Sequence, residues 1–431
     1  MLDIKFIREN LAAVKKSAKD KNVQVDIAKL LDLDKQRRKF QTQIDGVNRV
    51  RKNLAKNISK PSAADIKAGK SAKEKLAKLE KQYSATNDEY KKILEAVPNV
   101  SSKDTPAGND ESSNKVLRKV GKPAKFKYKP KTHLELGEAL DVIDMARAAK
   151  VSGARFAYLK GGLAMLEFAL IQHAMATLTD EKVLTSIIKK AKLKVSAKPF
   201  IPIVPPVLIK PDVMQRMDRL EPKNERYHTA TDDLYLIGSA EHSIGPIHMN
   251  EILQVGDMPV RYVGFSTSFR REAGSYGQDT KGIMRVHQFD KVEMETFSSA
   301  DDGLAEHELM IAIQEHLVKS LDLPYQVVLK CTGDQGKPNN RGVDIEMWMP
   351  SQNKYRETHS ADYMTDYQAR RLSTKVKMVD GQTELVHTND ATAFAIGRTL
   401  IAIMENNQQE DGSIEVPKVL QSYSGLKVIK K

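Results

Sequence analysis

The chain has 431 residues, enough for two to four domains and a full hydrophobic core. Apolar residues make up 40% and charged residues 29%, which excludes a disordered or fibrous protein. We expect no membrane span, which would need ~18–20 apolar residues, and the first ten residues lack the apolar core of a signal peptide. One cysteine, Cys331, excludes a disulfide scaffold. We therefore expect a cytoplasmic protein without a membrane partner.

The positive charge is concentrated near the N-terminus. Residues 1–100 contain 24 Lys and Arg against 13 Asp and Glu, which accounts for most of the net charge of +13. A basic segment beside a nearly neutral body indicates a polyanion partner, with nucleic acid favoured over a membrane. On charge alone, a solvated lysine-rich surface that binds nothing is an equally good interpretation.

Apolar residues at heptad spacing follow in residues 30–58 and again in residues 72–97, with Pro61 between the two runs. Proline ends one helix and can open the next, so the pattern predicts an antiparallel helical hairpin over about 27–98, within an N-terminal domain of residues 1–99. Thirty-odd helical residues project roughly 50 Å. Nine basic residues off the apolar seam could contact phosphates: Lys35, Arg38, Lys39, Arg49, Lys52, Lys56, Lys73, Lys75 and Lys78.

A Ser-, Pro- and Gly-rich stretch over residues 100–131 predicts a linker, and the body follows over 132–431. Strands and helices then alternate without regular βαβ spacing, which favours an antiparallel α+β body. The expected helices cover 161–179, 306–321 and 395–407, and the expected strands cover 200–204, 259–265 and 325–329.

The densest group of polar residues lies between residues 236 and 293. Ser239 and Glu241 would share one face of an extended segment. Arg270 and Arg271 lie between two predicted strands, and guanidinium groups match phosphate oxygens; Phe289 could stack on a base. A plain hairpin with surface ion pairs is an alternative interpretation. His242 and His248 have no third neighbour, so a histidine metal site is not predicted.

Several segments in order resemble the bacterial-type seryl-tRNA synthetases, a family of class II aminoacyl-tRNA synthetases, along essentially the whole chain. They are the first ten residues, the helical arm, residues 152–161, Pro205-Pro206 as the first class motif, 270–272 as the second, 285–293, 363–371, and 397–400 as the third.

This resemblance implies an antiparallel sheet of six or seven strands flanked by helices, and a homodimer built on the first motif. It implies activation of L-serine with ATP to seryl-adenylate, with Mg²⁺ on the triphosphate. The seryl group would then pass to the 3′ end of tRNA-Ser, with tRNA-Sec as a further candidate acceptor. The basic residues of the arm would contact the tRNA.

The resemblance also assigns roles residue by residue. Arg270 would bridge the α-phosphate and the serine carboxylate, and Arg398 would reach the γ-phosphate, which makes these two the catalytic pair. Glu272 would bind adenine between Phe289 and Arg398, and Glu357 with Ser360 would hold Mg²⁺. The wider ATP set adds Arg271, Val286, Thr358 and His359. The serine set is Ser239, Ala240, Glu241, Arg270, Glu293 and Thr392.

The chemistry of the residues agrees with these roles. Attack of a carboxylate on a phosphate brings two anions together, so a fixed cation and a metal ion offset their repulsion without a side-chain nucleophile. Two glutamates and two hydroxyl residues suit the ammonium and hydroxyl groups of serine, and such a site rejects alanine.

The chain departs from the family pattern in its pocket. Ser239-Ala240-Glu241 stands for a usual Thr-x-Glu, and Asp390-Ala391-Thr392 for Asn-Gly-Ser. Arg271 and the pair Thr358-His359 replace smaller residues. We interpret the exchange at 239 and 392 as a volume-conserving swap that keeps serine as the substrate. The alternative is a pocket shifted towards threonine or another amino acid.

Functions of a different class are a carrier-protein ligase and a non-catalytic RNA-binding subunit. Loss of the arm would indicate the first, and loss of the ATP arginines would indicate the second. The arm, Arg270 and Arg398 are all present.

Overall fold

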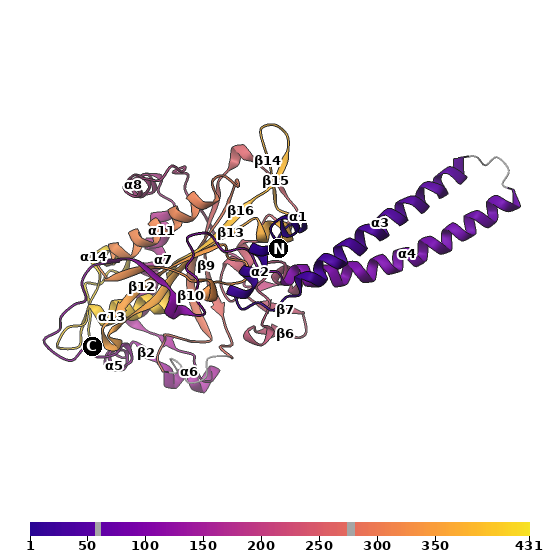
Figure 1. Cartoon of the computed structure of the whole chain (residues 1–431). Helices are drawn as coiled ribbons and strands as arrows, with labels where there is room; N and C mark the ends of the chain where they lie inside the picture. Colours follow the sequence, from indigo (N-terminus) through magenta and orange to yellow (C-terminus); the bar gives the residue numbers. More distant parts are fainter. Residues whose placement is uncertain (57–61, 274–280) are drawn as a thin grey trace. The chain divides into compact units, whose positions relative to one another are not determined.

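The computed structural model describes residues 1–56, 62–273 and 281–431. The chain divides into two compact units, Met1–Val100 and Ser101–Lys431. Figure 1 shows long paired helices in the first unit and a large sheet with helices in the second. The predicted α+β class with an N-terminal helical arm is therefore confirmed.

Within residues 1–56 and 62–100, the first unit has four helices: α1 (Ile4–Glu9), α2 (Leu11–Asp20), α3 (Ile27–Lys56) and α4 (Ala63–Ala96). Ser62 caps α4 in a capping box with Asp65, which satisfies backbone donors that the first helical turn leaves free. The predicted seam is present, because Ile44 and Val47 of α3 pack against Leu76 and Leu79 of α4. Pro61 and the seam residue Ile58 lie outside the described residues.

The second unit is built on an eight-stranded sheet of order β1-β11-β12-β13-β16-β10-β9-β4. All neighbouring strands are antiparallel except β4 and β9, which are parallel. The expected number of six or seven strands is wrong, because the sheet also includes short edge strands. The strands are β1 (Lys115–Val120), β4 (Ile201–Ile203), β9 (Val260–Phe269), β10 (Gln288–Ser298), β11 (Tyr325–Leu329), β12 (Arg341–Met349), β13 (Lys354–Thr365) and β16 (His387–Ala395).

Strand β1 lies inside the segment that the sequence predicts to be a linker. It pairs with β11 through Lys115↔Leu329 and Val120↔Tyr325, so residues 115–120 belong to the sheet. Its side chains are almost all exposed, including Val116 and Leu117, and Val120 packs against the core. The strand is therefore defined mainly by its backbone pairing at the edge of the sheet.

Apolar side chains from one face of the sheet pack against helices. Val292 and Met294 of β10, for example, join residues of α7 (Gly161–Leu178), α11 (Gly303–Ser320) and α13 (Ile396–Asn406) in one large core. The helices expected at 161–179, 306–321 and 395–407 are these three, and the expected strands are β4, β9 and β11. Because side chains alternate along a strand, the opposite face receives the polar residues between the core residues.

Helix α7 corrects one expectation. By length and composition alone it is apolar enough to cross a membrane, although no such stretch was expected. Its Leu163, Leu166 and Leu170 are fully buried in the core of the second unit. A buried core helix meets the same criterion as a membrane span, and these contacts account for its apolar character.

Smaller elements complete the second unit. They are α5 (His133–Ala139), β2 (Ile143–Asp144), α6 (Met145–Ser152), β3 (Tyr158–Leu159), α8 (Glu181–Ala191), β5 (Leu208–Ile209), α9 (Pro211–Arg216), β6 (His228–Thr229), β7 (Leu234–Leu236), α10 (Glu241–Ile244), β8 (Ile252–Gln254), α12 (Tyr367–Leu372), β14 (Lys375–Lys377), β15 (Thr383–Leu385), β17 (Ile414–Glu415), α14 (Lys418–Ser424) and β18 (Val428–Ile429).

Candidate active site

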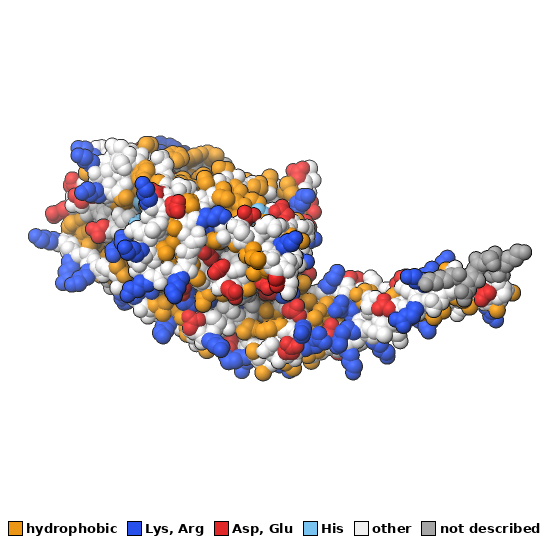
Figure 2. Space-filling view, turned by 90° about the horizontal axis from the view of Figure 1, so that it is seen from above, with side chains coloured by type: hydrophobic (Ala, Val, Ile, Leu, Met, Phe, Trp, Pro, Cys, Tyr) orange, Lys and Arg blue, Asp and Glu red, His pale blue; other side chains and the backbone are white. Residues whose placement is uncertain are grey.

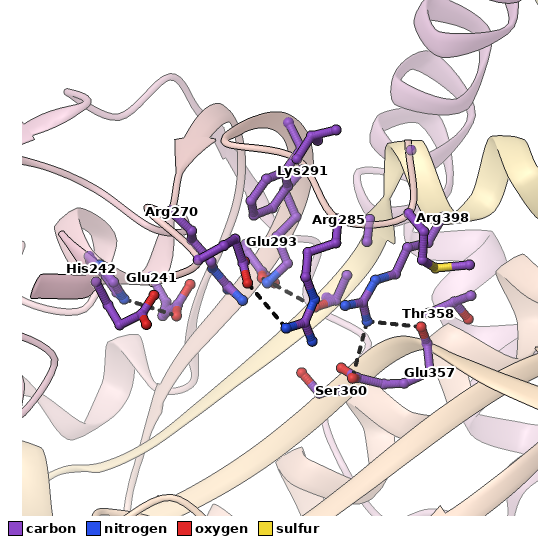
Figure 3. Close-up of a pocket in the computed structure, with 18 of the residues that line it drawn as sticks. Glu241, His242, Arg270, Arg285, Lys291, Glu293, Glu357, Thr358, Ser360 and Arg398 are labelled. Carbon is purple, nitrogen blue, oxygen red and sulfur yellow. Dashed lines mark hydrogen bonds and ion pairs between the residues drawn. The ribbon is translucent and has the colours of Figure 1, made fainter. Parts of the chain in front are cut away.

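The polar face of the sheet forms the floor of a cavity of about 570 Å³. Strand register brings its residues together: Glu293 of β10 lies opposite Thr392 of β16, and Asp390 lies opposite both Glu295 of β10 and Asp362 of β13. Figure 3 shows Arg270, Arg285 and Arg398 pointing into this cavity between Glu241 on one side and Glu357 on the other. The cavity therefore combines carboxylates and cations from segments far apart in the chain.

Two hydroxyl groups share one carboxylate oxygen at one end of the cavity. Ser239 Oγ donates to Glu293 Oε1 over 2.9 Å, and Thr392 Oγ1 donates to the same oxygen over 3.2 Å. The second oxygen, Oε2, is buried without a hydrogen-bond partner among the described residues. A buried acceptor without a partner costs free energy, so Glu293 Oε2 is available for the ammonium or hydroxyl group of a ligand.

Lys291 is a cation of this site that the sequence interpretation missed. Its Nζ donates to Ser239 Oγ over 2.9 Å and also contacts Glu293. Burial lowers the pKa of Lys291 to about 8, although Glu241 favours the charged form. The signal in the sequence was alternation, because residues 291 and 293 share one face of a strand.

Glu241 differs from the expectation of an extended Ser239–Glu241 segment. It is the first residue of α10, and Ala240 before it has helical dihedral angles. Burial opposes its ionisation, but His242, Lys291 and Arg219 hold the pKa of Glu241 well below its usual value. Glu241 is therefore an anion that faces the cavity.

The two predicted catalytic arginines occupy different places along the cavity wall. Arg270 follows directly after β9, donates from Nε to Gly238 O over 3.1 Å, and its guanidinium lies 5.3 Å from the ring centre of Phe289. Arg398, near the start of α13, donates from Nη1 to Glu357 O over 2.9 Å and forms an ion pair with Glu357 Oε2 at 3.1 Å. Arg270, rather than Arg398, thus covers the Phe289 ring in this structure.

A β-bulge explains how strand β13 presents its polar residues. Ile345 pairs with His359 and the next residue, Glu346, pairs with Glu357, so Thr358 is the extra residue. As a result Glu357, Thr358 and Ser360 all line the cavity. The extra residue shifts which side chains face the cavity.

The structure brings most of the predicted residues to the cavity wall, but not four of them. Glu241, Arg270, Glu272, Val286, Phe289, Glu293, Glu357, Thr358, Ser360, Thr392 and Arg398 line it.

The four others lie elsewhere. Ser239 and Ala240 are fully buried outside the wall, Ser239 behind Glu293. Arg271 is exposed. His359 is buried with its ring centre 5.7 Å from that of Phe394, a core residue, so its side chain points to the helix-covered face. His359 thus faces away from the other predicted ATP residues, whereas Arg271 lies between two of them but does not itself line the wall.

Arg219 and Asp390 form a buried ion pair that the sequence interpretation did not anticipate. Arg219 Nη2 lies 3.1 Å from Asp390 Oδ2, and both residues line the cavity. Burial raises the pKa of Asp390 to about 7, although Arg219 acts in the opposite direction. Glu295, only 1% exposed, has no hydrogen-bond partner for either carboxylate oxygen among the described residues. Burial and Asp390 raise the pKa of Glu295 well above its usual value.

No group of three or more His, Cys, Asp and Glu residues in the described parts of the chain has the arrangement of a metal site. Glu357 and Ser360 are therefore not part of an all-protein metal cage. A carboxylate and a hydroxyl beside a phosphate site suit Mg²⁺, which commonly takes few protein ligands and completes its shell with phosphate oxygens and water.

The predicted phosphate-contacting residues of the arm are exposed. Figure 2 shows Lys and Arg side chains distributed along this surface. Arg38 is also within 3.1 Å of Asp34, whereas the side chain of Lys56 lies outside the described residues. The exposed ones are Lys35, Arg38, Lys39, Arg49, Lys52, Lys73, Lys75 and Lys78.

Comparison with known proteins gives consistent matches. The profile of the "Seryl-tRNA synthetase N-terminal domain" matches residues 1–101, and that of the "tRNA synthetase class II core domain (G, H, P, S and T)" matches residues 223–407. The chain is 38% identical to the serine--tRNA ligase of Thermobifida fusca, covering 100% of this chain and 99% of that protein. It is 37% identical to the serine--tRNA ligase of Nitrosopumilus maritimus, covering 99% of each chain.

Solved structures agree with these matches. The seryl-tRNA synthetase of Pyrococcus horikoshii, complexed with ATP, has a TM-score of 0.88 at 36% identity, over 100% of this chain and 99% of that one. The cytoplasmic serine-tRNA ligase of Naegleria fowleri, in complex with AMP, has a TM-score of 0.85 at 28% identity, over the same shares.

Proposed function

The chain belongs to the seryl-tRNA synthetase family, and we propose how its own residues carry out that family's reaction. It is an ATP-dependent serine–tRNA ligase. The observation that carries the residue assignments is the cavity in which Glu241, Glu293 and Thr392 meet Arg270 and Arg398. That set provides acceptors for an ammonium and a hydroxyl group beside cations for a triphosphate.

In the first step, Glu241 and Glu293 hold the serine ammonium group, while the shared Glu293 carboxylate and Thr392 fix the hydroxyl. Arg270 lies between the serine carboxylate and the α-phosphate of ATP. A carboxylate oxygen forms a bond to the α-phosphorus, the bond from that phosphorus to the bridging oxygen breaks, and pyrophosphate leaves. Fixed cations lower the barrier by neutralising the charge of two approaching anions.

In the second step, a terminal ribose hydroxyl of tRNA-Ser attacks the seryl carbonyl carbon. The bond from that carbon to the phosphate oxygen breaks, and AMP leaves with the hydroxyl proton on its phosphate. Arg270 stays positioned by the backbone of Gly238, so its guanidinium needs no rearrangement between steps. Glu293, Thr392 and Ser239 keep the seryl side chain in place.

For ATP, we propose that adenine lies against Phe289 and contacts Glu272, which Arg285 holds at 3.3 Å. When the triphosphate takes Arg398, Glu357 loses its ion pair and becomes available, with Ser360, to Mg²⁺. The metal would neutralise phosphate charge. His359, which faces the core, contributes to this site less than the resemblance implies.

The remaining assignments concern partners and compartment. We propose that the exposed cations of the arm bind tRNA-Ser, that tRNA-Sec is a further acceptor, and that the protein works in the cytoplasm. We also propose a homodimer built on the first motif, where Val204, beside Pro205, is 85% exposed.

The test measures both half-reactions. Serine-dependent exchange of pyrophosphate into ATP, followed by charging of purified tRNA-Ser, should both occur and should both require Arg270. Exchange without tRNA charging would indicate a carrier-protein ligase, and RNA binding without exchange would indicate a non-catalytic subunit. Neither alternative is favoured by the matches over the whole chain.

A further inference from the structure

Two segments of the second unit contain many basic residues and no acidic ones, although the net charge of the whole unit is close to zero. Residues 115–131 contain eight Lys and Arg and no Asp or Glu, and residues 182–198 contain six Lys and no Asp or Glu. The remainder of residues 101–431 has 31 Lys and Arg against 43 Asp and Glu. The near-neutral total thus results from two strongly positive segments on an acidic body.

The second segment lines a cavity of about 410 Å³, and the first segment contacts the wall of that cavity. Ile187 and Lys190 of α8 line one side of it, and Glu315 and Lys319 of α11 line another. Segment 115–131 reaches the same place, because Arg118 donates from Nε to Glu315 Oε1 over 3.0 Å.

Val120 of β1 also pairs with Tyr325, another residue of the cavity wall. Register and ion pairing therefore bring Arg118 and Val120 to the wall of the cavity that α8 lines, and residues 121–131 continue the basic segment from there.

The lysines on this surface are free to meet a ligand. Lys189, Lys190, Lys192, Lys194 and Lys319 are exposed, and none forms an ion pair within the parts of the chain that the structure describes. Burial and the nearby Lys190 lower the pKa of His316, which also lines the cavity. Clustered lysines without ion-pair partners repel one another, and a bound anion would reduce this repulsion. The surface therefore favours an anionic ligand.

Aromatic residues alternate with the lysines in segment 115–131. Phe126 lies between Lys125 and Lys127, and its ring centre is 5.3 Å from that of Tyr128. Tyr128 is anchored through its hydroxyl, which donates to Gln408 O over 2.6 Å. Basic residues interleaved with aromatic rings are typical of surfaces that bind RNA backbones and stack unpaired bases.

The packing of α8 argues against a membrane as the partner. Leu184 and Ile187, the apolar residues of this helix that could enter a lipid surface, are buried in the protein core. A helix that lies in a membrane interface must have its apolar face free. After Glu181 at its start, the charged residues of α8 are the exposed lysines Lys182, Lys189 and Lys190, which match phosphates.

We propose that this basic body surface, formed by residues 115–131, 182–198 and Lys319, binds the phosphate backbone of tRNA independently of the helical arm. The proposal goes beyond the residue roles given above, since none of these residues lines the active-site cavity. Lysines contact phosphates as point charges and carry no base preference, so the surface adds affinity and orientation rather than sequence specificity.

The test uses two quadruple variants of the full chain. One carries Lys122→Gln, Lys125→Gln, Lys127→Gln and Lys129→Gln, and the other carries Lys189→Gln, Lys190→Gln, Lys192→Gln and Lys194→Gln. The matched control removes four exposed lysines elsewhere on the same unit: Lys375→Gln, Lys377→Gln, Lys427→Gln and Lys430→Gln. The dissociation constant for a tRNA-Ser transcript is measured between about 50 and 300 mM KCl, the range over which phosphate contacts show their salt dependence.

Removing one lysine that meets a phosphate lowers the slope of log K against log [KCl] by about one. Each variant should therefore lower the slope by about two and weaken binding about tenfold or more at low salt, if half of its lysines meet phosphates. The control should keep the parent slope.

Parent-like slopes and affinities in both variants would overturn the proposal. So would weaker binding to vesicles containing anionic lipid with unchanged tRNA binding, which would assign the surface to a membrane. Serine-dependent pyrophosphate exchange requires no RNA and should be unchanged in all three variants. Its absence in the parent protein would refute the proposed active site, while the binding slopes would still show whether the basic body surface binds tRNA.

Discussion

Removing the methyl group of Thr392 should loosen the discrimination between serine and threonine. Thr392 is buried, lines the cavity, and donates from Oγ1 to Glu293. In Thr392→Ser this hydrogen bond can persist, so the change removes one methyl group and little else. A methyl-sized difference in a pocket contributes about 1–3 kcal/mol of discrimination. We take the lower half of that range because the neighbours are polar, which predicts about a tenfold higher relative kcat/KM for threonine.

Ser239 provides the compensating change. It lies outside the cavity wall but shares the Glu293 oxygen with Thr392, so an added methyl group at 239 can act by moving that carboxylate. The double variant Ser239→Thr with Thr392→Ser should therefore recover most of the parental selectivity. The assay is pyrophosphate exchange with serine and with threonine, each over a range of concentrations.

Thr388→Ser is a suitable control. Thr388 lies on the same strand, is equally buried, and bonds to Gln368 away from the cavity. It should leave the ratio of threonine to serine activation unchanged. An unchanged ratio in Thr392→Ser, or no recovery in the double variant, would refute the view that residues 239 and 392 compensate through Glu293. Preferred activation of threonine by the parent protein would support the alternative of a shifted pocket.

The same cavity and the arm lead to three further predictions. Arg270→Ala or Arg398→Ala should lower the rate of pyrophosphate exchange by about 10²–10³-fold, because each removes a cation that faces the triphosphate. Circular dichroism should show an intact fold. A near-normal exchange rate would show that the replaced arginine is not part of the site. Replacing residues 41–82 by a short Gly-Ser linker, between the packed residues Phe40 and Tyr83, should leave exchange within about twofold but reduce tRNA charging about 10²-fold; equal loss of both would contradict the role of the arm. Burial raises the pKa of Asp390 from 3.8 to about 7, so the folded protein binds a proton at Asp390 more tightly than the unfolded chain does. The stabilisation of the folded state by this proton is therefore lost as the pH rises from about 4 to 7. Asp390→Asn should therefore show a smaller fall in Tm between pH 5 and 8 than the parent, and an equal fall would show that Asp390 does not titrate in that range.

Local patterns were sufficient to predict the arm. Leu76 and Leu79 stand at heptad positions and need no distant partner beyond the facing helix, so spacing alone identified their contacts. The same holds for α11 and α13, which have long apolar stripes. Features that depend on long-range pairing were missed: β1 is a short, mostly exposed strand, and its register with β11 is what identifies it.

In the site, too, residues within local motifs were predicted and contacts between distant segments were not. Arg270, Glu293 and Thr392 were identified by motif and lie together as expected. His359 was misplaced although alternation with Ser360, which lines the cavity, puts it on the opposite face of the strand. The bulge at Thr358 instead explains how Glu357 faces the cavity beside Thr358, and a bulge leaves no mark in the local sequence. Arg219 and Asp390 are 171 positions apart, so no local pattern could have paired them. Lys291 could have been found from its alternation with Glu293.

The central claim is that this cavity selects serine and that the chain transfers it to tRNA. The most direct test is aminoacylation of mixed tRNA with each of the twenty amino acids, in parallel reactions with ATP and Mg²⁺. We expect that serine alone is attached efficiently and that the charged species is tRNA-Ser. Preferential attachment of another amino acid, or efficient serine activation with no tRNA charged, would contradict that claim.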